Sequence, residues 1–341
     1  MIALDNKDIS IFRTLIADAH YIALVSHTNA DGDAVGSLLA TKRIIESHTK
    51  APIQCILPTP PPDMFSYLPG YNDILVDAYN HEHCIQTLCN ADLIIALDLN
   101  KADRIDNMSK ALTESQAHKV LIDHHHSPDT SLFHILFSIP EFSSTCELTY
   151  WLFTNMYGEG TIDRISATCL YSGICTDTGF FSYSCESPTV FEAAARLVAH
   201  NIDPAGIHNS ISNCFSINRM KFYGFAISER LRLFPEAGMA YFYISLADQK
   251  QFGIAPPDME GLVNYTLMMK DIKVGALLRE EPNRVKISLR SKDDFDVNAF
   301  ASKYWNGGGH TKAAGATSND TFENTIKLLE TNLLAEMATI C

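Results

Sequence analysis

The chain contains 341 residues, 46 % of them hydrophobic, and it carries a formal net charge of −14 at pH 7. This length and this apolar content are sufficient for two globular domains with separate cores. The acidic balance argues against a protein that coats long nucleic acid, because that function requires an extended cationic surface.

No segment has the character expected for crossing or leaving a membrane. The longest apolar runs are strand-sized, and the first ten residues lack the basic start and long apolar stretch of a signal peptide. The nine cysteines show no CxxC pair and no framework spacing, which fits reduced, buried thiols. We therefore expect a cytosolic protein without a membrane segment.

The N-terminal half alternates between strand-like and helix-like segments. Residues 1–20 have the apolar spacing of an amphipathic helix, residues 21–25 form a buried strand-like run, and residues 32–47 return to helical spacing. Further strands are expected at 53–57, 92–99 and 118–123, and further helices begin at the capping residues Ser144 and Asp163. Ser144 and Glu147 have the spacing of a capping box. This alternation predicts an α/β fold with a doubly wound parallel sheet.

The pattern becomes mostly helical after Asp177. We expect an N-terminal domain of residues 1–190, a helical connector at 191–225 and a smaller α/β domain at 226–341. The last domain has strand patterns near 239–246, 272–280 and 284–291, and helical patterns near 258–268 and 320–337. The second and third of these strands are separated by the turn EPN, which predicts an antiparallel hairpin.

Acidic and histidine side chains gather at four places where predicted strands end or the following loops begin. They are His27, Asp31 and Asp33; Asp98; Asp123, His124 and His125; and Asp177 after the run SGICT. Parallel strands deliver their carboxyl ends to one edge of a sheet, so these side chains are expected to converge. Oxygen and imidazole ligands without thiolate suit Mn²⁺, Mg²⁺, Co²⁺ or Fe²⁺. Two such ions sharing one carboxylate would neutralise the crowded acids and support phosphoryl chemistry.

Five segments resemble the motifs of the DHH phosphoesterase superfamily. They are HTNADGDAVGS, the aspartate of ALDLNKADR, IDHHHS, GICTDTG and GGGHTKAAG, and together they span residues 25–315. The last segment is similar to the signature of the DHH-associated substrate domain. The pattern is most similar to the nanoRNase and pAp-phosphatase group, also labelled RecJ-like or exopolyphosphatase-related.

The resemblance implies two divalent metal ions in the N-terminal domain, with Mn²⁺ as the preferred activator. Its implied ligands are His27 and Asp31 on one ion, Asp33, His124 and Asp177 on the other, and Asp98 as the bridge. His125 would face the scissile phosphate as a positive or proton-donating group, and Asp123 would orient its neighbours. The family usually has two histidines after this aspartate, so His126 is a departure and is left outside the site.

A basic patch marks the C-terminal domain. Residues 270–312 contain nine Lys/Arg and six Asp/Glu, a local charge of +3 that leaves −17 for the remainder. Such a patch suits a small anionic substrate. The resemblance places the substrate grip here, in SLRS with Arg290 and Ser291 and in the glycine run with Gly308, Gly309 and His310. Arg279 and Lys312 are lesser candidates. Arg290 offers a planar fork to phosphate, and a glycine run followed by a helix-like AAG segment lets backbone N–H groups approach an anion.

The predicted activity is hydrolysis of short oligoribonucleotides to 5′-mononucleotides, with dephosphorylation of pAp to AMP as a second reaction. The substrate is expected between the two domains, and long nucleic acid is not expected as a partner. Rivals with the same chemistry are hydrolysis of linear dinucleotides such as pApA, of pyrophosphate or polyphosphate, and of long strands. A non-catalytic nucleotide sensor is the rival from another class. The resemblance leaves the oligomeric state open, including a homodimer.

Overall fold

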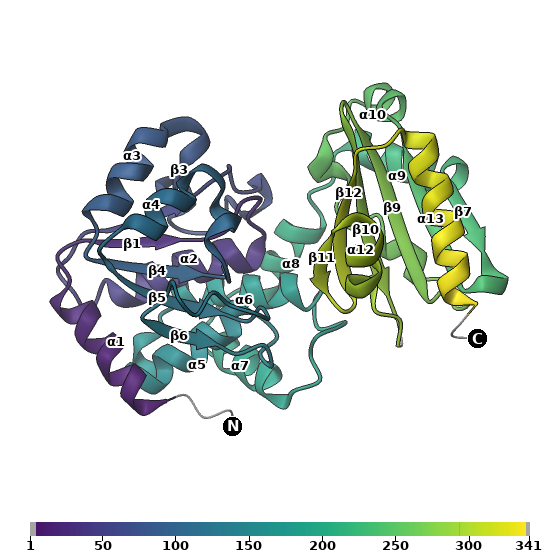
Figure 1. Ribbon diagram of the computed structural model, residues 1–341. Helices are drawn as coiled ribbons and strands as arrows, with labels where there is room; N and C mark the ends of the chain where they lie inside the picture. Colours follow the sequence, from purple (N-terminus) through teal and green to yellow (C-terminus); the bar gives the residue numbers. More distant parts are fainter. Residues whose placement is uncertain (1–4, 293, 339–341) are drawn as a thin grey trace. The chain divides into compact units, whose positions relative to one another are not determined.

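The computed structural model describes residues 5–292 and 294–338, and it divides between Cys214 and Phe215 into two compact units (Figure 1). The segment predicted as a connector is shared between them. Helices α7 (Pro188–Val198) and α8 (Pro204–Ser212) belong to the first unit, and α9 (Ile217–Glu229) begins the second. Within the described ranges, no helix has both the length and the apolar character needed to cross a membrane.

The first unit contains the predicted parallel sheet. Its six strands run in the order β3-β2-β1-β4-β5-β6, and every neighbouring pair is parallel. Their bounds are β1 Ile22–Val25, β2 Ile53–Leu57, β3 Leu75–Val76, β4 Leu93–Leu97, β5 His118–Asp123 and β6 Ile135–Ser138. Strands β1 and β4 are buried along their whole length, which is why they read as continuous apolar runs.

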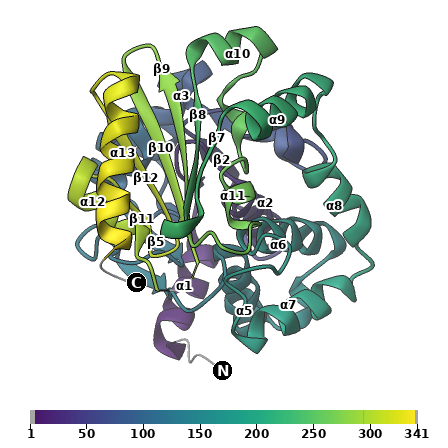
Figure 2. The same ribbon diagram turned by 90° about the vertical axis from the view of Figure 1, so that its right-hand side faces the viewer.

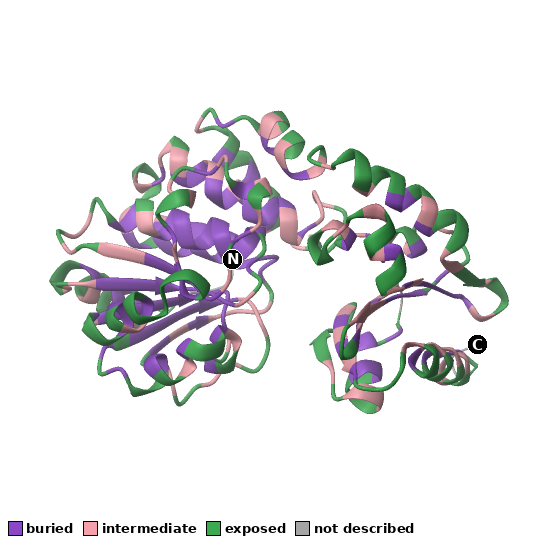
Figure 3. Ribbon diagram, turned by 90° about the horizontal axis from the view of Figure 1, so that it is seen from above, coloured by how far each residue is buried: buried purple, intermediate pink, exposed green. Residues whose placement is uncertain are grey.

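Helices cover both faces of this sheet, which confirms the doubly wound prediction. Helices α1 (Asn6–Asp18), α2 (Gly32–Ile45) and α5 (Thr145–Tyr157) share a core with one face, and α3 (Asp77–Asn90) and α4 (Ser109–Glu114) share a second core with the other. Helix α6 (Arg164–Asp177) packs against α2 and α5. Short 3₁₀ turns lie at Asp63–Phe65, Tyr71–Asp73, Ala102–Met108 (η3) and Glu159–Thr161. Figure 3 shows the buried residues along the strands and on the helices that pack against them.

Glycines set the close approach of α2 to α6. A Cβ added at Gly36 would lie 2.5 Å from the carbonyl oxygen of Cys169 on α6. A Cβ added at Gly173 would collide with Cys146 Sγ and lie 3.1 Å from the Cα of Asp33 on α2. No larger side chain fits at either position unless the two helices move apart.

Helix α5 begins at the predicted cap, with a variation. The Ser144 hydroxyl accepts a hydrogen bond from the backbone N–H of Glu147 at 3.0 Å. The Glu147 carboxylate, however, accepts from the backbone N–H of Ser143 at 2.9 Å rather than from Ser144. The first half of the capping box is therefore present, and the glutamate ties down the residue before the cap.

The second, smaller unit is built on a six-stranded, mostly antiparallel sheet in the order β11-β12-β10-β9-β8-β7. Among the described strands, only β8 and β9 are a parallel pair. The bounds are β7 Leu231–Phe234, β8 Met239–Ile244, β9 Val274–Glu281, β10 Arg284–Ser291, β11 Gly308–His310 and β12 Ala313–Ser318. The predicted hairpin is confirmed as β9–β10, with Glu281 opposite Arg284. The AAG segment is strand β12, so its helix-like reading was wrong: pairing with β10 overrides the helical preference of alanine.

Helices lie on both faces of the second sheet, but they leave one face of β10 only half-buried. Helices α12 (Val297–Trp305) and α13 (Phe322–Met337) pack on one face, and α9, α10 (Leu246–Phe252) and α11 (Asn264–Leu267) lie on the other side of the strands (Figure 2). The predicted helix at 258–268 is reduced to α11 and a 3₁₀ turn at Pro256–Met259. Along β10 the side chains alternate, so that Lys286, Ser288 and Arg290 are only half-buried while their neighbours are buried.

Candidate active site

The predicted acidic and histidine residues lie where the strand order of the first sheet reverses. Strands β1 and β4 are neighbours although they are not consecutive in sequence, and the crevice beyond such a switch point is the usual ligand site of doubly wound sheets. His27 follows β1, Asp98 follows β4 directly, and Asp123 is the last residue of the adjacent β5. The topology thus brings three distant segments to one place.

Two helix N-termini hold the carboxylates of the first segment. Asp31 caps α2 by accepting from the backbone N–H groups of Asp33 at 3.0 Å and Ala34 at 3.1 Å. Asp33 is fully buried, and it accepts from the backbone N–H groups of Thr145 at 2.7 Å and Cys146 at 2.8 Å at the start of α5. Helix N-termini favour negative charge, so α5 supports a carboxylate that would otherwise be costly to bury.

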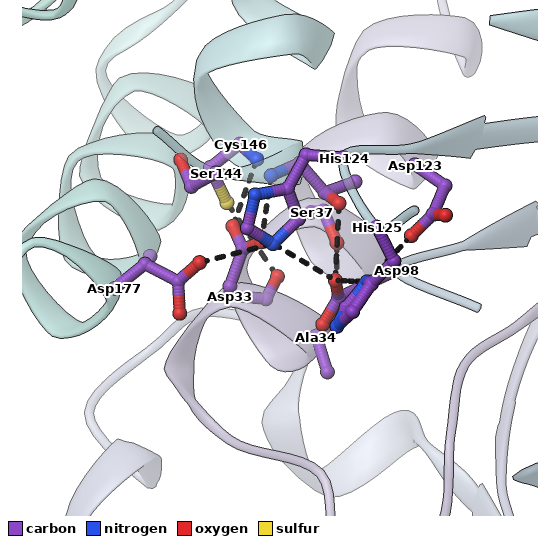
Figure 4. A network of polar contacts seen from close by, with 12 residues as sticks. Asp33, Ala34, Ser37, Asp98, Asp123, His124, His125, Ser144, Cys146 and Asp177 are labelled. Atoms are coloured by element: carbon purple, nitrogen blue, oxygen red, sulfur yellow. Dashed lines mark hydrogen bonds and ion pairs between the residues drawn. The ribbon is translucent and has the colours of Figure 1, made fainter. Parts of the chain in front are cut away.

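Asp98 is the centre of the constellation (Figure 4). It is only 2 % exposed and adopts a left-handed backbone conformation with φ of 56°, which is uncommon outside glycine. Its carboxylate lies 3.1 Å from His27 Nε2 and accepts from Thr145 Oγ1 at 3.1 Å. His125 Nδ1 is 3.3 Å away and His124 Nε2 is 3.7 Å away. One carboxylate therefore contacts groups from three other segments of the chain.

His124 links Asp98 to the remaining two carboxylates. Its Nε2 lies 3.2 Å from Asp177 and 3.9 Å from Asp33, and its Nδ1 is 3.3 Å from the Phe142 carbonyl oxygen. Asp177 joins the cluster as expected, but from the last residue of helix α6 rather than from the end of a strand. The helix start predicted at Asp163 is confirmed, but the grouping of Asp177 with the strand ends was wrong, because short apolar runs such as SGICT do not distinguish a strand from a buried helix.

His125 is held by Asp123 and approached by an arginine that we did not select from the sequence. Its Nδ1 lies 2.8 Å from Asp123 Oδ1, while its Nε2 lies 3.3 Å from Arg104 Nη1. Arg104 also approaches the carbonyl oxygen of Asp98 at 3.5 Å. The available signal was its position in ALDLNKADR, six residues after Asp98 in the same loop.

The electrostatics of the site indicate uncompensated negative charge. Burial and the charges of Asp98 and Asp31 raise the pKa of Asp33 well above its ordinary value. Burial and the charge of Asp33 likewise raise the pKa of Asp177. Burial acts in the same direction on Asp98, but the hydrogen bond with His27 and the neighbouring histidines outweigh it and lower the pKa of that carboxyl. Cations placed among these groups would relieve the repulsion between them.

Three overlapping groups of side chains in the described part of the chain could hold a metal ion. In each group the ligand atoms lie within 4.8 Å of one another: His27, Asp31 and Asp98; Asp33, His124 and Asp177; and Asp98, His124 and His125. All six residues predicted as metal ligands are included. The donors are oxygen and nitrogen only, which fits Mn²⁺, Mg²⁺ or Co²⁺.

The predicted substrate residues lie in the second unit, and they do not all share one face. Arg290 is half-buried on the same side of β10 as Lys286 and Ser288, and its Nη1 donates to the Leu289 carbonyl oxygen at 3.0 Å. Ser291 is 7 % exposed on the opposite side, and its hydroxyl donates to the Phe295 carbonyl oxygen at 2.7 Å.

Arg279 and the glycine run also belong to this sheet. Arg279 stands opposite Lys286 in the β9–β10 pairing and forms an ion pair with Glu281. The remaining predicted residues, Gly308, Gly309 and His310, form the exposed strand β11. Gly309 has φ of 148°, and a Cβ there would lie 2.5 Å from the Ala313 carbonyl oxygen. The run is thus a close-packed strand rather than a flexible turn.

Two family models match the chain, one in each unit. Residues 21–174 match the DHH family, N-terminal domain, and residues 237–335 match the DHHA1 domain. The first range contains the constellation except Asp177, and the second contains strands β8 to β12.

Several known proteins are similar over almost the whole chain. The crystal structure of an exopolyphosphatase-related protein from Bacteroides fragilis has a TM-score of 0.95 and 32 % sequence identity over 99 % of both chains. The bifunctional oligoribonuclease and PAP phosphatase NrnA of Bacillus subtilis is 26 % identical over 98 % of this chain and 97 % of that protein. The cyclic-di-AMP phosphodiesterase PdeA of Listeria monocytogenes is 23 % identical over 90 % of this chain, which corresponds to 46 % of that protein.

Proposed function

Because the chain belongs to the DHH family, we propose that it is a metal-dependent phosphoesterase that hydrolyses short oligoribonucleotides to 5′-mononucleotides and dephosphorylates pAp to AMP. The observation that carries the proposal is the convergence of four carboxylates and three histidines around Asp98 at the switch point of the sheet. The similarity to the bifunctional oligoribonuclease and PAP phosphatase NrnA of Bacillus subtilis supports the choice of both substrates.

Two divalent ions, with Mn²⁺ preferred, complete the proposed site. His27 and Asp31 hold one ion, Asp33, His124 and Asp177 hold the other, and Asp98 is shared. The grouping of these ligand atoms and the raised pKa values of Asp33 and Asp177 support this assignment. When bound, such a pair of ions polarises the phosphate and makes water a stronger nucleophile near neutral pH.

The protein's own side chains supply positioning and proton transfer in this proposal. Asp123 holds Nδ1 of His125, so that Nε2, which lies 3.3 Å from Arg104, faces the scissile phosphate as a positive or proton-donating group. The N-terminus of α5 fixes Asp33, and Thr145 fixes Asp98 through its hydroxyl. These contacts orient the carboxylates before any ligand binds.

We assign substrate binding to the half-buried face of strand β10 in the second sheet. Arg290, Lys286 and Ser288 share a half-buried face of β10, and the first two offer positive charge to a terminal phosphate. The local +3 of residues 270–312 stands against −17 elsewhere in the chain, which favours short substrates over long strands.

A product assay in Mn²⁺ tests the proposal. The substrates are a ribodinucleotide, an RNA of about five residues, an RNA of about twenty residues, pAp, pApA and pyrophosphate, because the long RNA tests whether a short basic patch guides a polymer. We expect rapid loss of the short RNAs and of pAp, persistence of the long RNA, and no turnover by Asp98→Asn. Cleavage of pyrophosphate alone would refute the nucleotide assignment.

A second candidate substrate is a linear dinucleotide such as pApA. The similarity to the cyclic-di-AMP phosphodiesterase of Listeria monocytogenes favours it, and the reaction needs the same two-ion site. Turnover of pApA that exceeds turnover of both pAp and the ribodinucleotide in the same assay would select this substrate.

A further inference from the structure

Arg104 stands beside the acidic constellation without pairing with any of its carboxylates. Its side-chain contacts both use Nη1, at 3.3 Å from His125 Nε2 and at 3.5 Å from the Asp98 carbonyl oxygen. Throughout residues 5–292 and 294–338, no Asp or Glu forms an ion pair with it and no group accepts a hydrogen bond from its Nε or Nη2. A guanidinium has five N–H donors, so most of them are available to an incoming anion.

The backbone fixes the position of Arg104 against the first site segment. Its carbonyl oxygen accepts from the backbone N–H of Thr28, the residue after His27, at 2.8 Å. Its own N–H donates to the Lys101 carbonyl oxygen at 3.3 Å, which closes a tight turn in η3. The arginine is therefore held by the same loop that carries the first histidine.

The loop around Arg104 is also locked to the segment that carries the DHH motif. The Asn100 side chain donates to the His126 carbonyl oxygen at 2.9 Å, and the Asn100 carbonyl oxygen accepts from the backbone N–H of Asp129 at 2.8 Å. Two non-glycine residues with positive φ, Asp98 at 56° and Asp106 at 47°, stand on either side of Arg104. Such backbone conformations are costly and concentrate at functional sites.

We propose that Arg104 is a catalytic residue that binds the non-bridging oxygens of the scissile phosphate together with His125. The proposal rests on the proposed phosphoesterase function. With Nδ1 of His125 taken by Asp123, Nε2 faces Arg104, so two nitrogen groups from different loops converge within 3.3 Å. A phosphate oxygen at this point accepts from Arg104, and it also accepts from His125 when Nε2 carries a proton. The planar fork of arginine matches the geometry of phosphate. Positive charge here stabilises the negative charge that develops in the transition state.

The charge of Arg104 reaches two of the three candidate metal groups. Its Nη1 contacts His125, which belongs to one group, and its positive charge also acts on His27, which belongs to another. Arg104 therefore offers a positive group beside the site that does not depend on metal binding.

Substitution of Arg104 separates this role from a purely structural one. Arg104→Ala removes the guanidinium, Arg104→Lys keeps the charge but loses the fork, and Lys101→Ala is the matched control because it removes an exposed cation from the same loop. The measurements are turnover of a ribodinucleotide and of pAp, inhibition by inorganic phosphate, Mn²⁺ affinity by calorimetry and the melting temperature. Turnover of Arg104→Ala is also measured with added guanidinium chloride at millimolar concentration.

We expect Arg104→Ala to lower kcat/KM about 100-fold, as the loss of one transition-state donor does in other enzymes. Phosphate inhibition should weaken, Mn²⁺ affinity and melting temperature should stay near those of the wild type, and guanidinium should restore part of the activity. The kcat/KM of Arg104→Lys should lie between those of Arg104→Ala and the wild type. The kcat/KM of Lys101→Ala should stay within about twofold of the wild type.

Wild-type turnover by Arg104→Ala would overturn the inference. So would a loss of activity that follows a matching loss of Mn²⁺ affinity or thermal stability and is not rescued by guanidinium. If the wild type itself fails to hydrolyse either substrate in Mn²⁺, the proposed function fails and the inference falls with it.

Discussion

Asp177→Asn is expected to stabilise the metal-free protein while it disables the metal-loaded one. Asp177 is the last residue of α6, where the helix dipole disfavours a carboxylate. Its side chain is 22 % exposed, and its partner in the structure is His124 at 3.2 Å. The remaining neighbours that influence its pKa are the carboxylates of Asp33, Asp31 and Asp98, all of which repel it.

The magnitude follows from the distance between the carboxylates. The ligand atoms of Asp33 and Asp177 lie within 4.8 Å of each other. At an effective dielectric constant of ~20, two like charges at this distance repel by about 3.5 kcal/mol. Asparagine keeps a hydrogen-bonding group for His124 but gives up the charge-assisted contact, which offsets about half of the gain. A net stabilisation of about 2 kcal/mol should raise the melting temperature of a unit of this size by about 4–8 °C.

The effect should grow as the pH rises. Burial and Asp33 raise the pKa of Asp177 above its ordinary value, so the folded metal-free protein holds this proton more tightly than the unfolded chain. The resulting stability is complete below the ordinary carboxyl pKa and is lost as the pH rises through the raised value. Asparagine does not titrate, so the melting temperature of the variant in excess chelator should increasingly exceed that of the wild type across this window.

The control lies at the other end of the same helix. Asp163 caps α6, accepts from the Ser166 N–H at 2.8 Å and pairs with Arg43 at 2.7 Å, so its pKa is lowered rather than raised. Asp163→Asn retains the cap and loses a surface ion pair, which should cost about 1 kcal/mol or less. Saturating Mn²⁺ should place Asp177→Asn below the wild type. A lower melting temperature for Asp177→Asn in chelator at every pH would refute the reasoning.

Three further changes test other parts of the structure. Thr145→Val removes the hydroxyl that donates to Asp98 at 3.1 Å, and calorimetry should show Mn²⁺ affinity reduced about 10–100-fold with little change in fold. Arg290→Ala should raise the Michaelis constant for a ribodinucleotide at least about tenfold without changing Mn²⁺ affinity, and an unchanged constant would remove this residue from the substrate grip. Gly309→Ala places a Cβ 2.5 Å from the Ala313 carbonyl oxygen, so thermal unfolding should show loss of at least about 1 kcal/mol in the second unit, and an unchanged transition would contradict the β11 pairing.

The fold and most of the constellation follow from local sequence signals. Parallel strands that are buried on both faces can be recognised in the sequence as continuous apolar runs. The ends of these runs identified His27, Asp98 and Asp123 as candidates. Ser144 and Asp163 marked helix starts because capping depends on a few adjacent backbone groups. These features are local, and the side chains they place were predicted together.

The features missed are those that depend on tertiary packing. Arg104 matters for the site only because its loop packs against His125. The hydrophobic periodicity of the sequence does not predict this contact. Asp177 was grouped with the strand ends although it lies on the helix that begins at Asp163, and the AAG segment became a strand through pairing with β10. By contrast, the sequence already predicts that Arg290 and Ser291 lie on opposite faces of the sheet, because neighbouring side chains alternate along a strand.

The glycine contacts between α2 and α6 fix the distance between two of the carboxylates in the proposed site. Asp33 and Asp177 are carried by these two helices, and the space between the helices is fixed by Gly36 and Gly173 rather than by flexible loops. An ion must then match a gap that already exists, so discrimination by ionic radius becomes a property of helix packing. Replacement of one glycine is therefore expected to change the spacing of Asp33 and Asp177, and with it the preferred ionic radius, while every ligand residue stays the same.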